Sequence, residues 1–255
     1  VSLTCSIGIA PAKFLAKIAS DLNKPDGLVV IPAEEVSGFV EKLPVEKVPG
    51  VGAQMCKKLS IMGIKTLGDV RIYPEKKLAA ILGKYGRRLA MLAEGRDGSQ
   101  VTPYSQPKSV SAEETFEIDT ADRETLKKYL LGHAAEVARQ LRKLGVKSKT
   151  ITLKIKHADF TQITRSKSLS IPTNSDRVLY REARRLLESF YLSQKVRLVG
   201  LGASGLVPEK NPVQLELFQL VDPDNDSWEK VDKTLDLIID RFGKSAIEKA
   251  ALKDK

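Results

Sequence analysis

The residues of this chain whose types and spacing could do chemistry are mainly glycines and cations. The sequence VPGVG at residues 48–52 lies between two helical patterns, and Lys57 and Lys58 follow it. Glycines permit a tight hairpin, and its backbone N–H groups at the start of the next helix form a site for a phosphate. The downstream sequence MGIKTLGDV at residues 62–70 has the spacing expected after such a hairpin. Together the two segments are typical of a helix-hairpin-helix motif that binds DNA without reading its sequence. An ordinary helix–loop–helix turn is the alternative.

A second cluster of cations suits a phosphate backbone. In GKYGRR at residues 83–88, small residues at a helix start lie near Lys84, Arg87 and Arg88. A further phosphate contact on the same strand fits this arrangement. The alternative is a solvated basic helix end.

The strand-like sequence TRSKS at residues 164–168 carries two more cations. Side chains alternate along a strand, so Arg165 and Lys167 point to the same side. Such phosphate contacts position a protein without reading sequence. Ile163 and Leu169 share that parity, so either a bulge intervenes or the face is mixed. A solvated edge strand is the alternative.

The sequence QLELF at residues 214–218 follows a segment that contains proline. Its glutamine, leucines and phenylalanine offer a polar anchor and apolar anchors for a preformed pocket on a partner. A short strand, or packing on the chain's own domain, is the alternative. The position after a predicted DNA-binding domain favours the partner.

The histidines and cysteines predict no further site. His133 lies in a helix stripe and His157 at a turn, and neither has a Cys, Asp or second His beside it, so both are expected to be structural. Cys5 and Cys56 are too few for a disulfide framework or a zinc site of the usual kind. Core roles and a reducing cytoplasm are therefore expected. No Ser-His-Asp or P-loop arrangement occurs.

Composition places the chain among ordinary globular proteins. Of its 255 residues, 42% are hydrophobic and 29% charged, and no apolar run is long enough to span a membrane. The net charge is +10, yet residues 211–255 carry 7 basic and 10 acidic side chains, so the body is basic and the tail acidic. A basic body favours a polyanionic partner through counterion release.

The elements that must position these residues fall into blocks. Residues 1–43 predict a βαβα piece that is too small to close its own sheet, and residues 44–101 predict a helical block punctuated by glycine. Residues 102–107 form the linker. Residues 108–208 predict the order βαββαβ, which gives a four-stranded, mostly antiparallel sheet with two helices on one face and the other face free. Residues 209–255 form a tail.

Two helix ends carry recognisable signals. Ser175 is expected to cap the second helix of the βαββαβ block. In the tail, Asp226 and Glu229 fit a capping box, and Gly243 ends the helix that follows. An apolar stripe on that helix either docks on the body or meets a partner. The stripe consists of Trp228, Val231, Leu235, Ile238 and Phe242.

Several of these sequences resemble one known family. CSIGIAPAKFLAKIASDLNKPDG closely resembles the late palm segment of Y-family translesion DNA polymerases, those of the DNA polymerase IV type in particular. LPVEKVPGVG with the segment after it resembles their thumb, KSVSAEETF with the βαββαβ block resembles their little finger, and QLELF resembles the motif that docks on the β sliding clamp. The resemblance covers nearly the whole chain. It implies a multidomain α and α+β fold of partial palm, helix-hairpin-helix thumb, little finger and clamp-binding tail.

The resemblance also implies roles for individual residues. Lys24 matches the lysine that reaches the triphosphate of the incoming nucleotide. The thumb hairpin that holds the primer backbone matches Gly50, Val51, Gly52 and Ala53. Its second contact matches Lys84, Tyr85 and Gly86, with Arg87 beside them.

Two further sets of residues follow from the same resemblance. The little-finger contacts to the template backbone match Lys108, Ser109, Arg165 and Lys167. The clamp-docking anchors match Gln214, Leu215, Leu217 and Phe218. The expected partners are therefore primer–template DNA and the β sliding clamp.

One departure from the family decides what is expected of this chain alone. The family uses two metal ions held by acidic residues, and those residues and the fingers lie in segments that precede Val1. We expect a fragment, a monomer without a cofactor of its own, that transfers no nucleotide. Mg²⁺ and the incoming dNTP are implied for the complete polymerase.

Two alternatives from other classes stay open. A stand-alone, non-catalytic protein could bind DNA and clamp, although a half sheet left free exposes its edges. A nuclease-associated helix-hairpin-helix module is the other, but the sequence shows no metal-binding carboxylate cluster.

Overall fold

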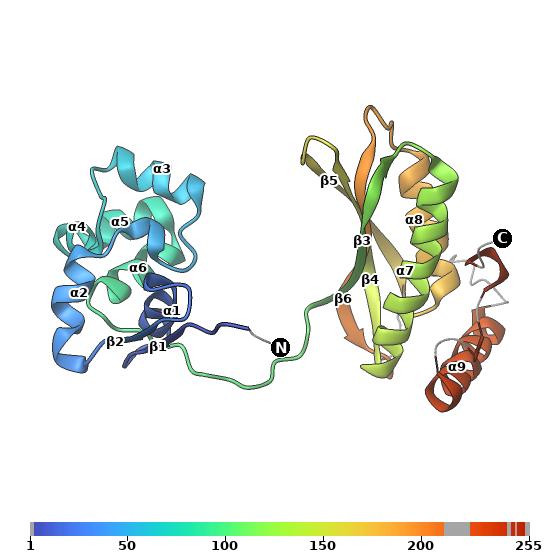
Figure 1. Ribbon diagram of the computed structural model, residues 1–255, viewed down its shortest axis with the longest axis horizontal. Coiled ribbons are helices and arrows are strands. Elements are labelled where there is room, and N and C mark those ends of the chain that lie inside the picture. Colours follow the sequence, from blue (N-terminus) through green and yellow to red (C-terminus); the bar gives the residue numbers. More distant parts are fainter. Residues whose placement is uncertain (1–2, 212–224, 244–245, 248, 253–255) are drawn as a thin grey trace. The chain divides into compact units, whose positions relative to one another are not determined.

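The computed structural model of the chain describes residues 3–211, 225–243, 246–247 and 249–252. The chain divides into two compact units, Val1–Ser105 and Gln106–Lys255, and each is described by itself (Figure 1). Within the described ranges, no helix is long and apolar enough to cross a membrane.

The first unit begins with two short parallel strands and a helix between them. β1 (Ile7–Ile9) pairs with β2 (Leu28–Val30), and α1 (Lys13–Leu22) packs on both. Gly8 permits this packing, because a methyl group there would lie 2.2 Å from the carbonyl oxygen of Ala16. The buried face of α1 has helical spacing and consists of Phe14, Leu15, Ile18 and Ala19.

Short helices complete the first unit. In chain order they are a 3₁₀ turn at Ala33–Glu35, α2 (Val36–Lys42), a 3₁₀ turn at Val45–Lys47, α3 (Ala53–Ile61), α4 (Leu67–Ile72), α5 (Glu75–Leu82) and α6 (Lys84–Ala93). A single hydrophobic core runs from Phe14 to Ala93 and includes the fully buried Leu59 and Leu78. The βαβα piece therefore shares its core with the helical block.

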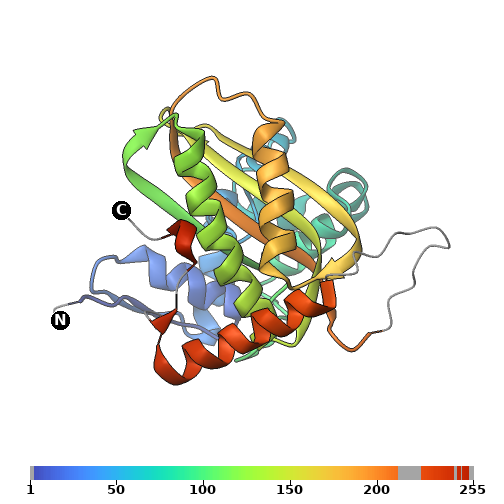
Figure 2. The ribbon, with the colours of Figure 1, turned by 90° about the vertical axis from the view of Figure 1, so that its right-hand side faces the viewer.

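The second unit contains the order βαββαβ that the sequence predicts. Its elements are β3 (Ser109–Thr120), α7 (Arg123–Lys143), β4 (Val146–His157), β5 (Gln162–Thr173), α8 (Asp176–Glu188) and β6 (Val196–Pro208). The strands form one antiparallel sheet in the order β3-β6-β4-β5. The helices α7 and α8 lie side by side on one face (Figure 2). The predicted fold class is confirmed.

Alternation and helical periodicity explain these elements. In β4, Ile151, Leu153 and Ile155 are at most 2% exposed, and they face the helices. Gly145 follows α7 with φ at +64°, a backbone conformation that favours glycine. The buried stripe of α7 includes Leu126, Leu130, Ala134, Val137 and Leu141.

The tail forms α9 (Asn225–Phe242), and a 3₁₀ turn follows at Ala250–Leu252. Its predicted apolar stripe docks only in part: Leu235 lines a hollow between α9 and α7, and the Trp228 ring lies 4.8 Å from the Arg177 guanidinium of α8. Trp228 is 41% and Phe242 63% exposed, whereas Asp232 is only 3% exposed. The docked face is mixed, because it also carries acidic side chains that meet cationic side chains of α7. The side chain of Asp226 lies outside the described residues, so the capping box stays a prediction.

The expectation that Ser175 caps α8 is wrong in one respect. Ser175 occupies the N-cap position, but its Oγ is buried and makes no hydrogen bond. Its backbone N–H instead donates to Thr173 Oγ1 over 3.1 Å. The carboxylate of Asp176 in the first turn interacts favourably with the positive end of the helix dipole in its place.

Candidate nucleic-acid interface

The predicted hairpin at residues 48–52 presents its two glycines to solvent. Gly50 is exposed with φ at +95°, and Gly52 is exposed at the start of α3. Val51 differs: its side chain is 8% exposed, and its N–H donates to Val48 O over 3.0 Å. Val51 therefore holds the hairpin to the core and has no free N–H for a ligand.

The start of α3 supplies the free donors. No side chain caps the helix, and its first helical hydrogen bond runs from Cys56 N to Gly52 O over 2.9 Å. Within the described part of the chain, no acceptor is found for the N–H groups of Ala53, Gln54 and Met55, because a helix leaves its first N–H groups unpaired. Together with the helix dipole, they can bind an anion.

The predicted motif at residues 83–88 contacts the hairpin at residues 48–52 and holds it in place. Tyr85 of α6 donates its hydroxyl hydrogen bond to Pro49 O over 3.0 Å, although the residues are 36 positions apart. Burial raises the pKa of this hydroxyl. Gly86 is buried, and a methyl group there would lie 2.4 Å from Leu78 O, so it lets α5 and α6 pack closely. The exposed cations of the motif are Lys84, Arg87 and Arg88.

Lys24 is exposed in the turn after α1. Its Nζ lies 2.5 Å from Asp21 Oδ1, and this lysine holds the pKa of the Asp21 carboxyl below its usual range. Both side chains are more than half exposed, so the ion pair is weak and a phosphate can compete for the lysine.

The register of the sheet shows which way the TRSKS cations point. Arg165 pairs with Leu153 and Lys167 with Ile151, so both cations share the helix-covered side of the sheet. They stay exposed because β5 is the edge strand. Of the two options left by the sequence, the mixed face is therefore correct.

The open face of the sheet carries hydroxyls, lysine and glycine. Ser109 of β3 lies on this face opposite Ser204 of β6, and Lys108 directly before it is exposed. Thr152 of β4 and Ser166 of β5 share a hydrogen bond of 2.9 Å. Sequence reasoning missed Thr152, although the alternation in β4 already indicated it. A hollow of about 240 Å³ on this face is floored by Gly200 and Gly202 and flanked by Glu113 and Lys154, which form a 2.7 Å ion pair.

Two family models match the chain. The one described as the thumb domain of DNA polymerase iota matches residues 46–97, and the one described as the impB/mucB/samB family C-terminal domain matches residues 107–217. DNA polymerase IV of Desulfatibacillum aliphaticivorans is 39% identical over 254 residues, which cover 99% of this chain and 64% of that protein. DNA polymerase IV of Caulobacter vibrioides is 37% identical over 247 residues, which cover 97% of this chain and 60% of that protein.

A solved structure agrees with these matches. The Y-family DNA polymerase chimera Dbh-Dpo4(243-245)-Dbh is 28% identical and superposes with a TM-score of 0.63, over 79% of this chain and 58% of the chimera. The chain belongs to the Y family of DNA polymerases. It spans 64% of the length of the Desulfatibacillum relative and 60% of the length of the Caulobacter relative.

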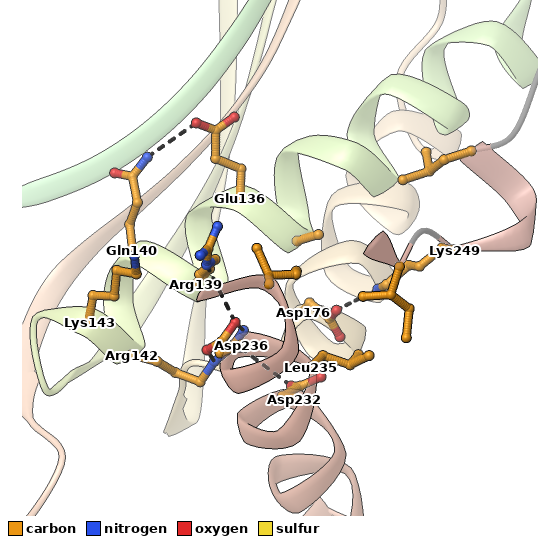
Figure 3. A pocket seen from close by; sticks show the side chains of 14 residues that line it. Glu136, Arg139, Gln140, Arg142, Lys143, Asp176, Asp232, Leu235, Asp236 and Lys249 are labelled. Atoms are coloured by element: carbon orange, nitrogen blue, oxygen red, sulfur yellow. Dashed lines mark hydrogen bonds and ion pairs between the residues drawn. The ribbon is translucent and has the colours of Figure 1, made fainter. Parts of the chain in front are cut away.

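A further hollow in the second unit of this Y-family chain contains a cluster of paired charges. It encloses about 570 Å³ between α7, α8, α9 and the segment that contains Lys249 (Figure 3). Arg142 binds Asp236 through two hydrogen bonds of 2.6 and 2.9 Å, and Arg139 lies 2.5 Å from Asp240. These cations are occupied by carboxylates of the same chain, so the hollow is a seam that holds α9 and not a DNA surface.

One carboxyl in this seam has an unusual environment. Asp232 is 3% exposed and lies 3.5 Å from Arg142. Burial, and then the nearby charge of Asp176, raise the pKa of Asp232 to about 6, and Arg142 opposes this shift. The carboxyl therefore titrates within two units of neutral pH.

The sequence predicts structural roles for the two histidines and a clamp-binding role for residues 214–218. His133 and His157 are buried, and burial lowers the pKa of His133. Across the described ranges, no three His, Cys, Asp or Glu side chains are grouped to hold a metal ion. Residues 214–218, with Gln214, Leu215, Leu217 and Phe218, lie outside the described residues, so the clamp motif stays a prediction.

Proposed function

We propose that this chain is the part of a Y-family translesion polymerase that grips primer–template DNA by its sugar–phosphate backbone. The observation that carries the proposal is the exposed hairpin before α3, with unpaired N–H groups at Ala53 and Gln54. Backbone amides at a helix start bind phosphate whatever the base sequence. Grip without base contacts suits a polymerase that copies damaged templates.

The second unit contributes another grip in this proposal. Ser109 lies on its open sheet face directly after the exposed Lys108. Its edge strand carries Arg165 and Lys167 on the other face. Hydroxyls and cations of this kind contact phosphates and fix the position of a duplex. We assign the template backbone to this unit and the primer backbone to the hairpin, with Lys24 directed to the nucleotide triphosphate.

The metal ions of nucleotide transfer are assigned elsewhere in the complete polymerase. Mg²⁺ is implied by the family, but the described residues contain no group of three side chains that could hold it. In this proposal the described part binds and orients DNA, and the metal-binding carboxylates lie in another part of the complete polymerase.

The grip is tested by neutralising exposed cations beside the hairpin. The double substitution Lys84→Ala and Arg87→Ala should weaken binding to primer–template DNA, because each lost phosphate contact reduces counterion release. Fluorescence anisotropy with labelled DNA measures the affinity.

A matched control comes from the preceding helix. Lys76 and Lys77 are also exposed but lie on α5, outside the predicted site. Lys76→Ala with Lys77→Ala removes the same charge and should have a smaller effect. Equal losses in the two variants would show that net charge alone governs binding and would contradict a localised grip.

We further propose that QLELF binds the β sliding clamp. Leu217→Ala with Phe218→Ala should abolish binding to the clamp, because the motif has few other apolar anchors. Affinity for DNA should be unchanged in the same variant. Clamp binding that survives the double substitution, measured by surface plasmon resonance, would remove this assignment.

A further inference from the structure

An exposed aromatic ring marks the tip of the hairpin between β4 and β5. Phe160 is 59% exposed, and its φ is +66°. A bulky residue with positive φ is strained, and glycine or asparagine would adopt this backbone at lower cost. Because the ring is largely outside the core, folding gains little from having phenylalanine at this position.

The hairpin tip is held against the loop before β6. Ala158 N–H donates to Lys195 O over 3.1 Å, and Gln194 Nε2 donates to Asp159 Oδ2 over 3.2 Å. Asp159 also accepts from Thr161 N over 2.9 Å. Both segments stand at the same end of the second unit (Figure 1). The position of Phe160 is thus fixed by hydrogen bonds of its neighbours Ala158 and Asp159 and not by burial of its ring.

Two cations flank the ring. Lys156 Nζ and the Arg197 guanidinium each lie 4.7 Å from the centroid of Phe160. Arg197 is also 4.0 Å from Asp119, which limits where its guanidinium can point. An aromatic ring with cations beside it offers a stacking surface together with charges that attract phosphate.

We propose that Phe160, Lys156 and Arg197 form a stacking site for an unpaired DNA base. Bases inside a duplex are stacked on each other, so their faces reach a protein ring only in a single strand. The ring or the adjacent guanidinium would stack on the base, and the cations would bind its flanking phosphates. The inference rests on the proposed function, because it takes the grip on DNA as given and adds an unpaired template segment to it.

Binding of blunt duplex and of the same duplex with a single-stranded template extension tests the site. A fluorescent adenine analogue in the extension reports stacking through quenching. The unchanged chain should prefer the extended DNA and quench the analogue. Phe160→Leu should reduce that preference about fivefold or more, with quenching lost and affinity for the blunt duplex unchanged. Phe160→Trp should restore both signals.

The control is an aromatic residue of similar exposure elsewhere. Phe242 of α9 is 63% exposed, and Phe242→Leu should leave the preference for the extension unchanged. Equal preference and quenching in Phe160→Leu and the unchanged chain would overturn the inference while the grip on duplex stands. If the unchanged chain bound neither DNA, the proposed function itself would fail, and the inference with it.

Discussion

The hydroxyl of Tyr85 joins two segments that the sequence treats as separate phosphate contacts. By donating to Pro49 O, it fixes the carbonyl directly before Gly50, and the ring lies so close that a methyl group on Gly50 would come within 2.9 Å of the hydroxyl. Tyr85 is thus a positioning residue for the hairpin. The residues free to meet phosphate are the backbone of Ala53 and its neighbours, with Lys84 and Arg87.

Removing only this hydroxyl tests the role. Tyr85→Phe should lower the free energy of unfolding by about 1 kcal/mol, because Pro49 O loses its donor. It should also weaken DNA binding, since the hairpin is held less firmly. Tyr73 packs half-buried on the same core, and no hydrogen bond of its hydroxyl is found in the described structure, so Tyr73→Phe is the control. Urea unfolding and anisotropy measure both effects; no change in Tyr85→Phe would contradict the role.

The helix α9 shows how charge decides the docking of an element. The sequence left open whether its apolar stripe docks on the body or meets a partner, and the docked face combines Leu235 of that stripe with Asp232 and Asp236 against Arg142. Arg142 is 9% exposed, and removing one partner of such a buried pair leaves an uncompensated charge. The acidic excess of the tail therefore has a structural use within the second unit.

The pKa of Asp232 gives this contact a pH dependence. Because the pKa is raised to about 6 in the folded chain, its charged form is disfavoured there. Its contribution to stability is full below pH about 4, falls as pH rises and levels off above pH 6. The lowered pKa of buried His133 acts in the opposite direction, since stability is lost as pH falls below about 6.5.

The variant Asp232→Asn separates the two groups, because His133 is common to both chains. The unfolding free energy of the unchanged chain minus that of the variant should fall between pH 4 and pH 6. Urea unfolding at several pH values measures this difference. A difference that stays constant with pH, or one that rises, would contradict the raised pKa of Asp232.

At the scale of the whole molecule, the positive charge is concentrated outside the tail. Residues 1–101 carry 15 basic and 10 acidic side chains, and residues 102–210 carry 20 and 12. Each compact unit therefore has its own excess of cations. Binding through both units would lengthen the contact with the backbone and make affinity strongly dependent on salt.

Local patterns predicted the elements of both units but not the contacts between distant segments. The alternation of Ile151, Leu153 and Ile155 was sufficient to predict β4, and the apolar stripe at residues 126–141 was sufficient to predict α7. Burial on one face follows the period of each element, so the sequence pattern shows it directly. The side of Arg165 was undecided, since exposure at an edge strand depends on strand order. The bond from Tyr85 to Pro49 and the pairing of Arg142 with Asp236 join residues far apart in sequence, which periodicity does not report.

The salt dependence of affinity for primer–template DNA tests the two-part grip most directly. The logarithm of the binding constant should fall linearly with the logarithm of salt concentration, by about 0.9 for each phosphate neutralised. Lys84→Ala with Arg87→Ala, and separately Arg165→Ala with Lys167→Ala, should each reduce the slope by about 2, and all four together by about 4. A flat titration, or a slope that either pair leaves unchanged, would contradict a backbone grip shared by the two units.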